Sequence, residues 1–321
     1  MDLIGKRNYF FVFSILIILA GLVTWFAKGG PNGGFKLDIQ FQGGTVIQMQ
    51  MKNDKFDMNK AVATVKKSIG KDATTQKSQT FNANEKNKNI NLLLVNISNK
   101  SALTPTELNT VTDALNADYK DDVVAGSHPD VNFIEPLIGN EVRTNGVKAV
   151  VVSSILIILY IWWRFNVMSG LSAGVMAVLA LLHDVAIMLS IYVFFGIPLN
   201  ESFIAASLTV IGYSMNDTII IYDRIRENSN MLRKTPIAEL VNKSILQTLS
   251  RSINTVVTVL MCVIITFAFA AYYNIESMKE FTLPLVVGIA SGCYSSIFIA
   301  SPLWVVWKQS QEKGNINPAK A

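Results

Sequence analysis

The sequence lacks the features of a disulfide-rich, metal-binding or nucleotide-binding protein. Its only two cysteines, Cys262 and Cys293, both lie inside apolar runs, where we expect small buried side chains rather than a disulfide framework. It contains no Walker A loop, nucleophile triad, zinc-ligand spacing or dinucleotide fingerprint. We therefore expect no metal, no cofactor and no enzymatic activity, and we do not expect ATP-driven chemistry within this chain.

Charged residues are also scarce, at 16% of the chain, whereas hydrophobic residues make up 50%. Apolar runs close to the ~20 residues needed to cross a bilayer recur along the sequence. This pattern predicts a polytopic α-helical membrane protein. The six expected spans lie at roughly 9–27, 147–163, 168–195, 202–222, 252–272 and 282–307.

The first apolar run follows Lys6 and Arg7, as in a signal peptide. It is long, however, and no small-residue cleavage pattern follows it, so an uncleaved anchor helix is expected. The net charge of +5 is not a nucleic-acid signal, because most basic residues fall where membrane topology would place them. We therefore expect the chain to lie in a lipid bilayer and to bind no nucleic acid.

An even number of spans puts both termini on one side of the membrane, and the charges of short loops decide which side. The short loops on the opposite side, 196–201 and 273–281, hold only Lys279. We therefore expect both termini to be cytoplasmic in a cell membrane. The basic residues on the terminal side are Lys6, Arg7, Arg164, Arg224, Arg226, Arg233, Lys234, Lys243, Lys308, Lys313 and Lys320.

A polar segment between the first two spans has the pattern of an α+β domain. It divides the chain into 1–27, 28–142 and 143–321. Strands are expected near 45–51, 74–82, 90–97 and 131–134, with one helix after Asp57 and another opened by the capping box at Thr104. This β-α-β-β-α-β order predicts a ferredoxin-like extracytoplasmic domain, with a hairpin loop at 82–89.

The cytoplasmic loop 223–251 begins with a charged helix end and continues as an amphipathic helix that runs into the fifth span. The charged end is either a solvated salt-bridge cluster or a docking surface for cytoplasmic loops. Its members are Asp223, Arg224, Arg226, Glu227 and Asn228.

Asn216 and Asp217 occur within the apolar fourth span. A carboxylate at bilayer depth costs roughly 2.5–3.5 kcal/mol on insertion scales, so such a residue usually has a purpose. Asp217 is a candidate proton acceptor, because burial and a nearby cation change the proton affinity of a carboxylate in opposite directions. The alternative is a hydrogen bond to a neighbouring helix that holds the bundle together.

Two further positions are candidates for the same proton path. Arg251 opens the fifth span and either points inward to pair with Asp217 or extends to the lipid headgroups. His183 and Asp184 lie in the middle of the third span, and histidine titrates near neutral pH. The alternative for this pair is an interhelical hydrogen bond to Ser, Thr or Asn.

These residues resemble the signature of the SecF family, subunits of the bacterial protein-export machinery. The most specific part is Asn216-Asp217-Thr218 followed by residues 223–228, although Met215 stands where a β-branched residue is usual. The remaining matches, in chain order, are Asp38-Ile39-Gln40-Phe41-Gln42-Gly43-Gly44-Thr45, Ile138-Gly139-Asn140-Glu141, His183-Asp184 and Asn242-Lys243-Ser244-Ile245 with Gln247-Thr248-Leu249-Ser250-Arg251-Ser252. The Gly43-Gly44 pair by itself indicates only a tight turn.

The resemblance implies half of an RND-type bundle that pairs with a SecD-like subunit. It also implies contact with the SecY/SecE/SecG channel, with YajC and YidC, and with translocating preproteins. Such a complex would use the proton-motive force to assist translocation, with Asp217 and Arg251 at the proton-conducting interface. Half of a small-molecule/proton antiporter of the RND type and a passive scaffold subunit are the alternatives.

Overall fold

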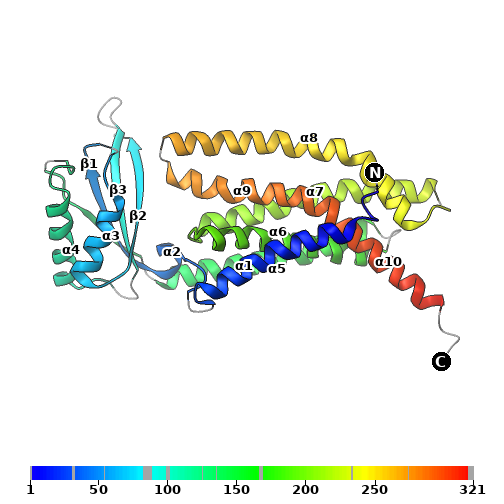
Figure 1. The fold of residues 1–321 in the computed structure, drawn as a ribbon, viewed down its shortest axis with the longest axis horizontal. Helices are drawn as coiled ribbons and strands as arrows, with labels where there is room; N and C mark the ends of the chain where they lie inside the picture. The colour runs from blue at the N-terminus through cyan, green and yellow to red at the C-terminus, as the bar shows by residue number, and fades with distance from the viewer. Residues whose placement is uncertain are drawn as a thin grey trace.

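The computed structural model describes residues 2–30, 33–53, 55–81, 89–98, 102–124, 126–134, 136–165, 169–232, 234–273 and 275–316. A four-stranded sheet with its helices lies at one end of a long helical bundle (Figure 1). The start of α1 and the end of α10 lie at the opposite end. The hairpin loop expected at 82–89 lies, except for its last residue, outside the described residues.

Six helical segments are long and apolar enough to cross a membrane, which confirms a polytopic helical membrane protein. The last of them is continuous through a π-helical turn, η3, between α9 and α10. In order they are α1 (Arg7–Ala27), α5 (Pro136–Arg164), α6 (Gly170–Phe195), α7 (Glu201–Met231), α8 (Ile237–Tyr272) and the series α9 (Glu276–Ser295), η3 (Ser296–Ala300) and α10 (Ser301–Ile316).

The helices form a buried centre and an exposed periphery. About half of the apolar stretch is buried in α6 and α7 (50% each) and more in the α9–α10 span (61%), whereas only 11% is buried in α1, α5 and α8. Small residues allow the central helices to approach closely. At Gly292 of α9, for example, an added Cβ would lie 2.8 Å from the Cβ of Ser214 on α7.

Residues 223–251 are mostly helical, in agreement with the charged helix end and the amphipathic helix expected there. Helix α7 continues to Met231 and α8 begins at Ile237, so only residues 232–236 connect them. Both extensions have apolar faces that pack on the core, through Ile225 of α7 and Val241 of α8. Burial of these faces makes the helices longer than the membrane-spanning patterns alone suggested.

The N-terminal residues before α1 also pack on this end of the bundle. Leu3 and Ile4 are each 2% exposed and belong to the same apolar core. The backbone N–H of Leu3 donates to Asn242 Oδ1 of α8 at 2.8 Å. This contact was not predicted, because five residues are too few to show a periodic pattern.

The sheet domain has the element order β-α-β-β-α-β after a single-turn helix, α2. Its sheet order is β2-β3-β1-β4, and each neighbouring pair is antiparallel. The elements are α2 (Ile39–Gln42), β1 (Gly44–Met51), α3 (Met58–Ile69), β2 (Ala73–Phe81), β3 (Asn89–Ser98), α4 (Pro105–Asp118) and β4 (Asp130–Ile134).

Side chains that alternate along the strands form the core between the sheet and its two helices. Ile47 and Met49 of β1 and Val95 of β3 are buried against Val65 of α3 and Leu115 of α4. Alternation at a period of two therefore gives this sheet an apolar face toward α3 and α4. This core is separate from those of the helical bundle.

Candidate functional site

Asp217 lies on the face of α7 that is buried in the bundle. Its side chain is 4% exposed, and its Oδ2 atom has no hydrogen-bond partner among the described residues. Ser252 of α8 lies beside this carboxylate, yet Ser252 Oγ also forms no hydrogen bond of normal geometry there. Asp217 is therefore a buried carboxylate with an unfilled position for a proton or another donor.

The α7 surface next to Asp217 is open in this single chain. Asn216 is exposed, and an added Cβ at Gly212 would have no atom within 4 Å. Ala205 and Thr209 continue the same row of small or polar residues and are also exposed. Lipid-facing surfaces are apolar and bulky, so this row has the composition of a helix–helix contact.

Arg251 does not pair with Asp217 in this structure. It is exposed on α8, and no ion pair joins the two side chains within the described parts of the chain. The reason is geometric: Ser252 points inward toward α7, and its neighbour Arg251 is rotated by about 100° around the helix. Arg251 thus points away from the buried contact of Ser252 with α7, and the pair stays a hypothesis.

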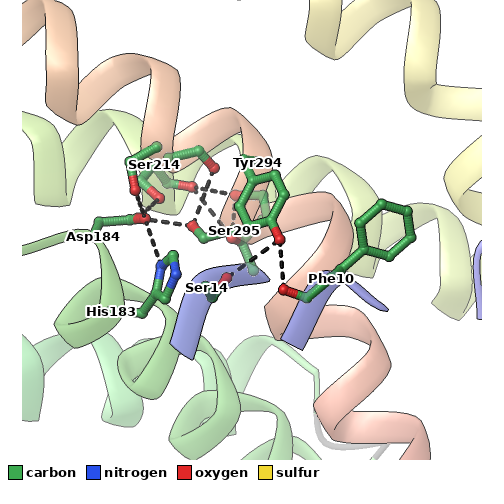
Figure 2. Close-up of polar contacts among 11 residues, drawn as sticks. Phe10, Ser14, His183, Asp184, Ser214, Tyr294 and Ser295 are labelled. Atoms are coloured by element: carbon green, nitrogen blue, oxygen red, sulfur yellow. Dashed lines mark hydrogen bonds and ion pairs between the residues drawn. The ribbon is translucent and has the colours of Figure 1, made fainter. Parts of the chain in front are cut away.

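His183 and Asp184 form the centre of a second buried site, between α6, α7 and α9 (Figure 2). Asp184 is 1% exposed. Its Oδ2 accepts hydrogen bonds from Ser214 Oγ of α7 at 2.9 Å and from Ser295 Oγ of α9 at 2.8 Å. Its Oδ1 accepts from Ser291 Oγ of α9 at 2.7 Å. The interhelical hydrogen bonds to serine that were the alternative prediction are thus present.

His183 connects this site to α1. Its Nδ1 lies 3.3 Å from Asp184 Oδ1, and its Nε2 is buried without a partner among the described residues. The imidazole stacks on the ring of Tyr294, with 6.2 Å between the two ring centroids. The Tyr294 hydroxyl donates to the Phe10 carbonyl at 2.8 Å and accepts from Ser14 Oγ at 3.2 Å, so it ties α9 to α1.

A hydroxyl pair links α7 to the π-helical turn close to Asp217. Thr218 Oγ1 and Ser296 Oγ lie 2.8 Å apart, and Ser296 Oγ also donates to the Ser214 carbonyl at 3.2 Å. Ser301 Oγ donates to the Ser296 carbonyl, five residues earlier, at 3.3 Å. π-Helical turns within α-helices often mark functional sites.

The charged cluster at the end of α7 docks on neighbouring helices. Asp223 binds Arg164 of α5 at 3.2 Å and Arg226 at 2.8 Å, and Arg224 pairs with Glu227. Three hydrogen bonds reach α8: Arg224 Nε donates to Gln247 Oε1 at 2.7 Å, and Asn228 Nδ2 lies 2.8 Å from both Ser244 Oγ and Gln247 Oε1. The cluster therefore has features of both predicted alternatives. Its ion pairs are half-exposed, as in a solvated salt-bridge cluster, whereas Asn228 is buried against α8, as in a docking surface.

Asp38 joins the sheet domain to the helical bundle. Its carboxylate caps α2 by accepting from the Ile39 N–H at 2.6 Å, and its own N–H donates to the Leu199 carbonyl between α6 and α7 at 2.8 Å. Burial raises the pKa of Asp38, and the charge of Glu201 acts in the same direction. Gly43 and Gly44 both have positive φ, and an added Cβ at Gly44 would lie 2.3 Å from the Ile97 carbonyl oxygen.

The two cysteines are both free. Cys293 is half-buried near Asp217, but Cys262 is exposed on α8. The prediction of two buried cysteines was thus wrong for Cys262. In the described residues, no group of three or more His, Cys, Asp or Glu side chains is arranged to hold a metal ion.

Comparison with known proteins identifies the family. Residues 114–310 match the family model described as "Protein export membrane protein SecD/SecF, C-terminal". The chain is also 33% identical to the protein translocase subunit SecF of Anaerolinea thermophila, over 97% of this chain and 95% of that protein. The chain belongs to the SecF family.

Some relatives join SecF to a second protein in a single chain. The chain is 34% identical to the protein translocase subunit SecDF of Thermus thermophilus, over 97% of its own length but only 39% of that protein. A crystal structure of SecDF from the same organism, described as a translocon-associated membrane protein, superposes with a TM-score of 0.74 at 31% identity. That match covers 96% of this chain and 39% of the SecDF chain.

Sequence reasoning located both buried acids but missed the three serines that donate hydrogen bonds to one of them, Asp184. Ser214, Ser291 and Ser295 are spaced so that all three reach Asp184 from two different helices. The only signal was the unusual density of serine in an otherwise apolar last span, at 291, 295, 296 and 301. That signal does not identify the acceptor, which depends on how the helices pack.

Proposed function

We propose that this chain is a non-enzymatic subunit of the bacterial Sec protein-export machinery. It pairs with a SecD-like subunit and uses the proton-motive force to assist preprotein translocation beyond the SecY channel. Two observations support the SecD partner: relatives exist as SecDF fusions, and the α7 surface beside Asn216 is open and polar. Contacts with SecY/SecE/SecG, YajC, YidC and preproteins follow from the family and belong to the same proposal.

The observation that carries the proposal is Oδ2 of Asp217, which has no hydrogen-bond partner in the part of the chain that the structure describes. This atom is buried on a central helix next to the surface that would meet SecD. Asn216 is exposed on that surface and Arg251 is exposed on α8, so we propose that the partner completes the site around Asp217. Alternation between a desolvated state and a state near Arg251 would let Asp217 bind and release a proton.

The topology that we propose places both termini in the cytoplasm and residues 28–142 outside. The sheet domain and the termini of the described helices lie at opposite ends of the bundle, in agreement with the distribution of basic residues. We also propose that the domain is ferredoxin-like, because its element order and its sheet order β2-β3-β1-β4 match that fold. Since helix α5 begins at Pro136, the boundary with residues 143–321 falls inside a continuous helix.

The energy available from one proton is adequate for the proposed task. Moving one charge through 100 mV releases about 2.3 kcal/mol. This would bias a two-state domain roughly fiftyfold, at about 1.4 kcal/mol per factor of ten. The proton gradient thus replaces a chemical cofactor in this proposal, and the Asp38 linkage between Leu199 and the sheet domain provides a mechanical connection.

The proposal is tested by substituting Asp217→Asn in the full chain assembled with its SecD partner. The amide keeps the shape of the side chain but cannot exchange a proton. We expect the part of export that depends on an imposed proton gradient to be lost in membrane vesicles, while export driven without the gradient continues. The matched control is Asp223→Asn, which changes a half-exposed carboxylate on the same helix.

The results also distinguish the alternative functions. Unchanged gradient-dependent export in Asp217→Asn and in Arg251→Met would favour a passive scaffold. A small-molecule antiporter would require an apolar binding pocket. A cavity of about 710 Å³ between the sheet domain and the helices combines apolar surface with charges of both signs, such as Lys36, Asp72, Lys279 and Glu280, and binding of a small molecule there would favour this alternative.

A further inference from the structure

We propose that Asp184 is a positioning residue that stays charged throughout transport and holds α7 so that Asp217 faces α8. The inference rests on the proposed function, in which Asp217 exchanges the proton. It assigns different roles to two buried carboxylates that sequence reasoning placed on one proton path. The structural basis is the set of donors around each of them.

Three serine hydroxyls donate to Asp184, and His183 Nδ1 is its fourth polar neighbour. With the imidazole proton on Nδ1, all four neighbours are donors, and an ionised carboxylate accepts at each of these positions. Hydrogen bonds donated to a carboxylate stabilise its charged form. In this tautomer, taking up a proton would require at least one of the four donors to give up its acceptor.

Asp217 has the opposite surroundings. Its Oδ2 is buried and unpartnered in the described residues, so a proton can be added there without displacing an existing donor. The two side chains are equally well shielded, at 1% and 4% exposure, and burial alone does not distinguish them. The number of hydrogen bonds that each carboxylate accepts does distinguish them.

Ser214 transmits the position of Asp184 to Asp217. It lies three residues before Asp217 on α7, and residues at this spacing are neighbours on one side of a helix. The bond from Ser214 to Asp184 therefore fixes the turn of α7 that carries Asp217 against α6. Ser296 holds the same turn from the other side, through the Ser214 carbonyl and Thr218 Oγ1.

The π-helical turn explains how one helix supplies both contacts. Ser295 and Ser296 are consecutive, yet Ser295 donates to Asp184 on α6 and Ser296 contacts α7. Consecutive side chains on an α-helix diverge by about 100°, and the wider turn that begins at Ser296 changes the direction of the following residues. The unusual winding of η3 thus serves the two buried contacts.

Infrared spectroscopy of the full SecF–SecD complex in membranes can test these roles, because a protonated carboxylic acid has a distinct carbonyl band. The spectra would be compared over the range in which histidine titrates, roughly pH 5 to 8. The neighbouring titratable groups are His183 and Tyr294 for Asp184, and Tyr213 and Cys293 for Asp217. None of these four side chains has a carbonyl group, so their titration adds no carboxylic-acid band to the spectrum.

We expect a pH-dependent acid band that disappears in Asp217→Asn and persists in Asp184→Asn. If the band instead disappears in Asp184→Asn and persists in Asp217→Asn, Asp184 is the exchanging acid and the inference is wrong. If neither substitution removes a pH-dependent band and Asp217→Asn supports normal gradient-dependent export, the proposed function itself fails. The two failures are therefore distinguishable.

A serine pair tests the positioning role even if the Asp184 variant folds poorly. Ser214→Ala should move the midpoint of the Asp217 band by about one pH unit, the size expected from loss of one buried hydrogen bond. Ser214→Thr, which keeps the hydroxyl, should restore it. The matched control is Ser207→Ala, a buried serine of α7 that donates only to its own helix at Phe203. An identical midpoint in Ser214→Ala and wild type would overturn the positioning role.

Discussion

The two buried carboxylates of the helical bundle, Asp184 and Asp217, are alike in burial and unlike in their partners. Asp184 accepts from three serine hydroxyls on two other helices, whereas Asp217 has one oxygen with no partner among the described residues. When a carboxylate is buried, hydrogen-bond donors of the protein must replace the water that would otherwise solvate its charge. Among the described residues, Asp184 has such donors on both oxygens, whereas Asp217 Oδ2 has none. The comparison shows that donor content, rather than depth, separates an anchoring acid from an exchanging one.

The largest expected effect concerns stability. Asp184→Ala leaves three buried hydroxyls without their acceptor, and we expect it to lower the free energy of unfolding by about 3 kcal/mol. Asp217→Ala removes a carboxylate that is incompletely partnered and should leave stability nearly unchanged. Thermal unfolding of the two variants in the same detergent measures the difference. Equal losses of stability would contradict the contrast between the two acids.

The close contact between α7 and α9 gives the next effect. Gly292→Ala places a Cβ 2.8 Å from the Cβ of Ser214, and overpacking of this kind typically costs about 1–3 kcal/mol. Gly212→Ala lies on the open side of α7, where an added Cβ has no atom within 4 Å, and should not lower stability. Chemical or thermal unfolding of the isolated chain compares them. A larger loss for Gly212→Ala would show that the open side is packed in solution.

The open side of α7 should matter only in the complex. Gly212→Leu adds bulk where the single chain has free space, so we expect normal folding but weaker pairing with the SecD-like subunit. Co-purification of the two subunits in mild detergent, compared with that of Gly212→Ala, measures pairing. Full recovery of the partner with Gly212→Leu would place the SecD contact elsewhere.

The smallest effect lies in the sheet domain, far from both acids. Hydrogen bonds from Lys71 and from the N–H of Thr104 lower the pKa of Glu107 from 4.5 to about 2. The stabilisation from ionised Glu107 is therefore complete above about pH 4.5 and disappears as the pH falls toward about 2. Protection of the α4 amides in the full chain, taken as the exchange rate of an unstructured chain divided by the observed rate at the same pH, should fall across this interval, and Glu107→Gln should remove that dependence. Constant protection across the interval in the wild type would contradict the assigned cap.

The sheet domain could be predicted closely from the sequence because its signals are local. The Thr104 capping box gave the start of α4, and the strand expected at 45–51 is observed at Gly44–Met51. Caps and period-two alternation depend on residues only a few positions apart. Six spans followed equally directly from the lengths of the apolar runs.

The environment of the acids could not be predicted, because it depends on contacts between distant segments. Ser291 and Asp184 are 107 residues apart, and no periodic pattern connects them. The outward direction of Arg251 likewise follows from the rotation of α8 against α7, which a single helical pattern leaves open.

The most direct test of the central claim is proton conduction by the chain and its SecD partner reconstituted in liposomes under an imposed proton gradient. The wild-type complex and Asp184→Asn should conduct protons, and Asp217→Asn should not. Equal conduction by the wild type and Asp217→Asn would show that protons do not pass through this carboxylate, and the proposed coupling would be wrong.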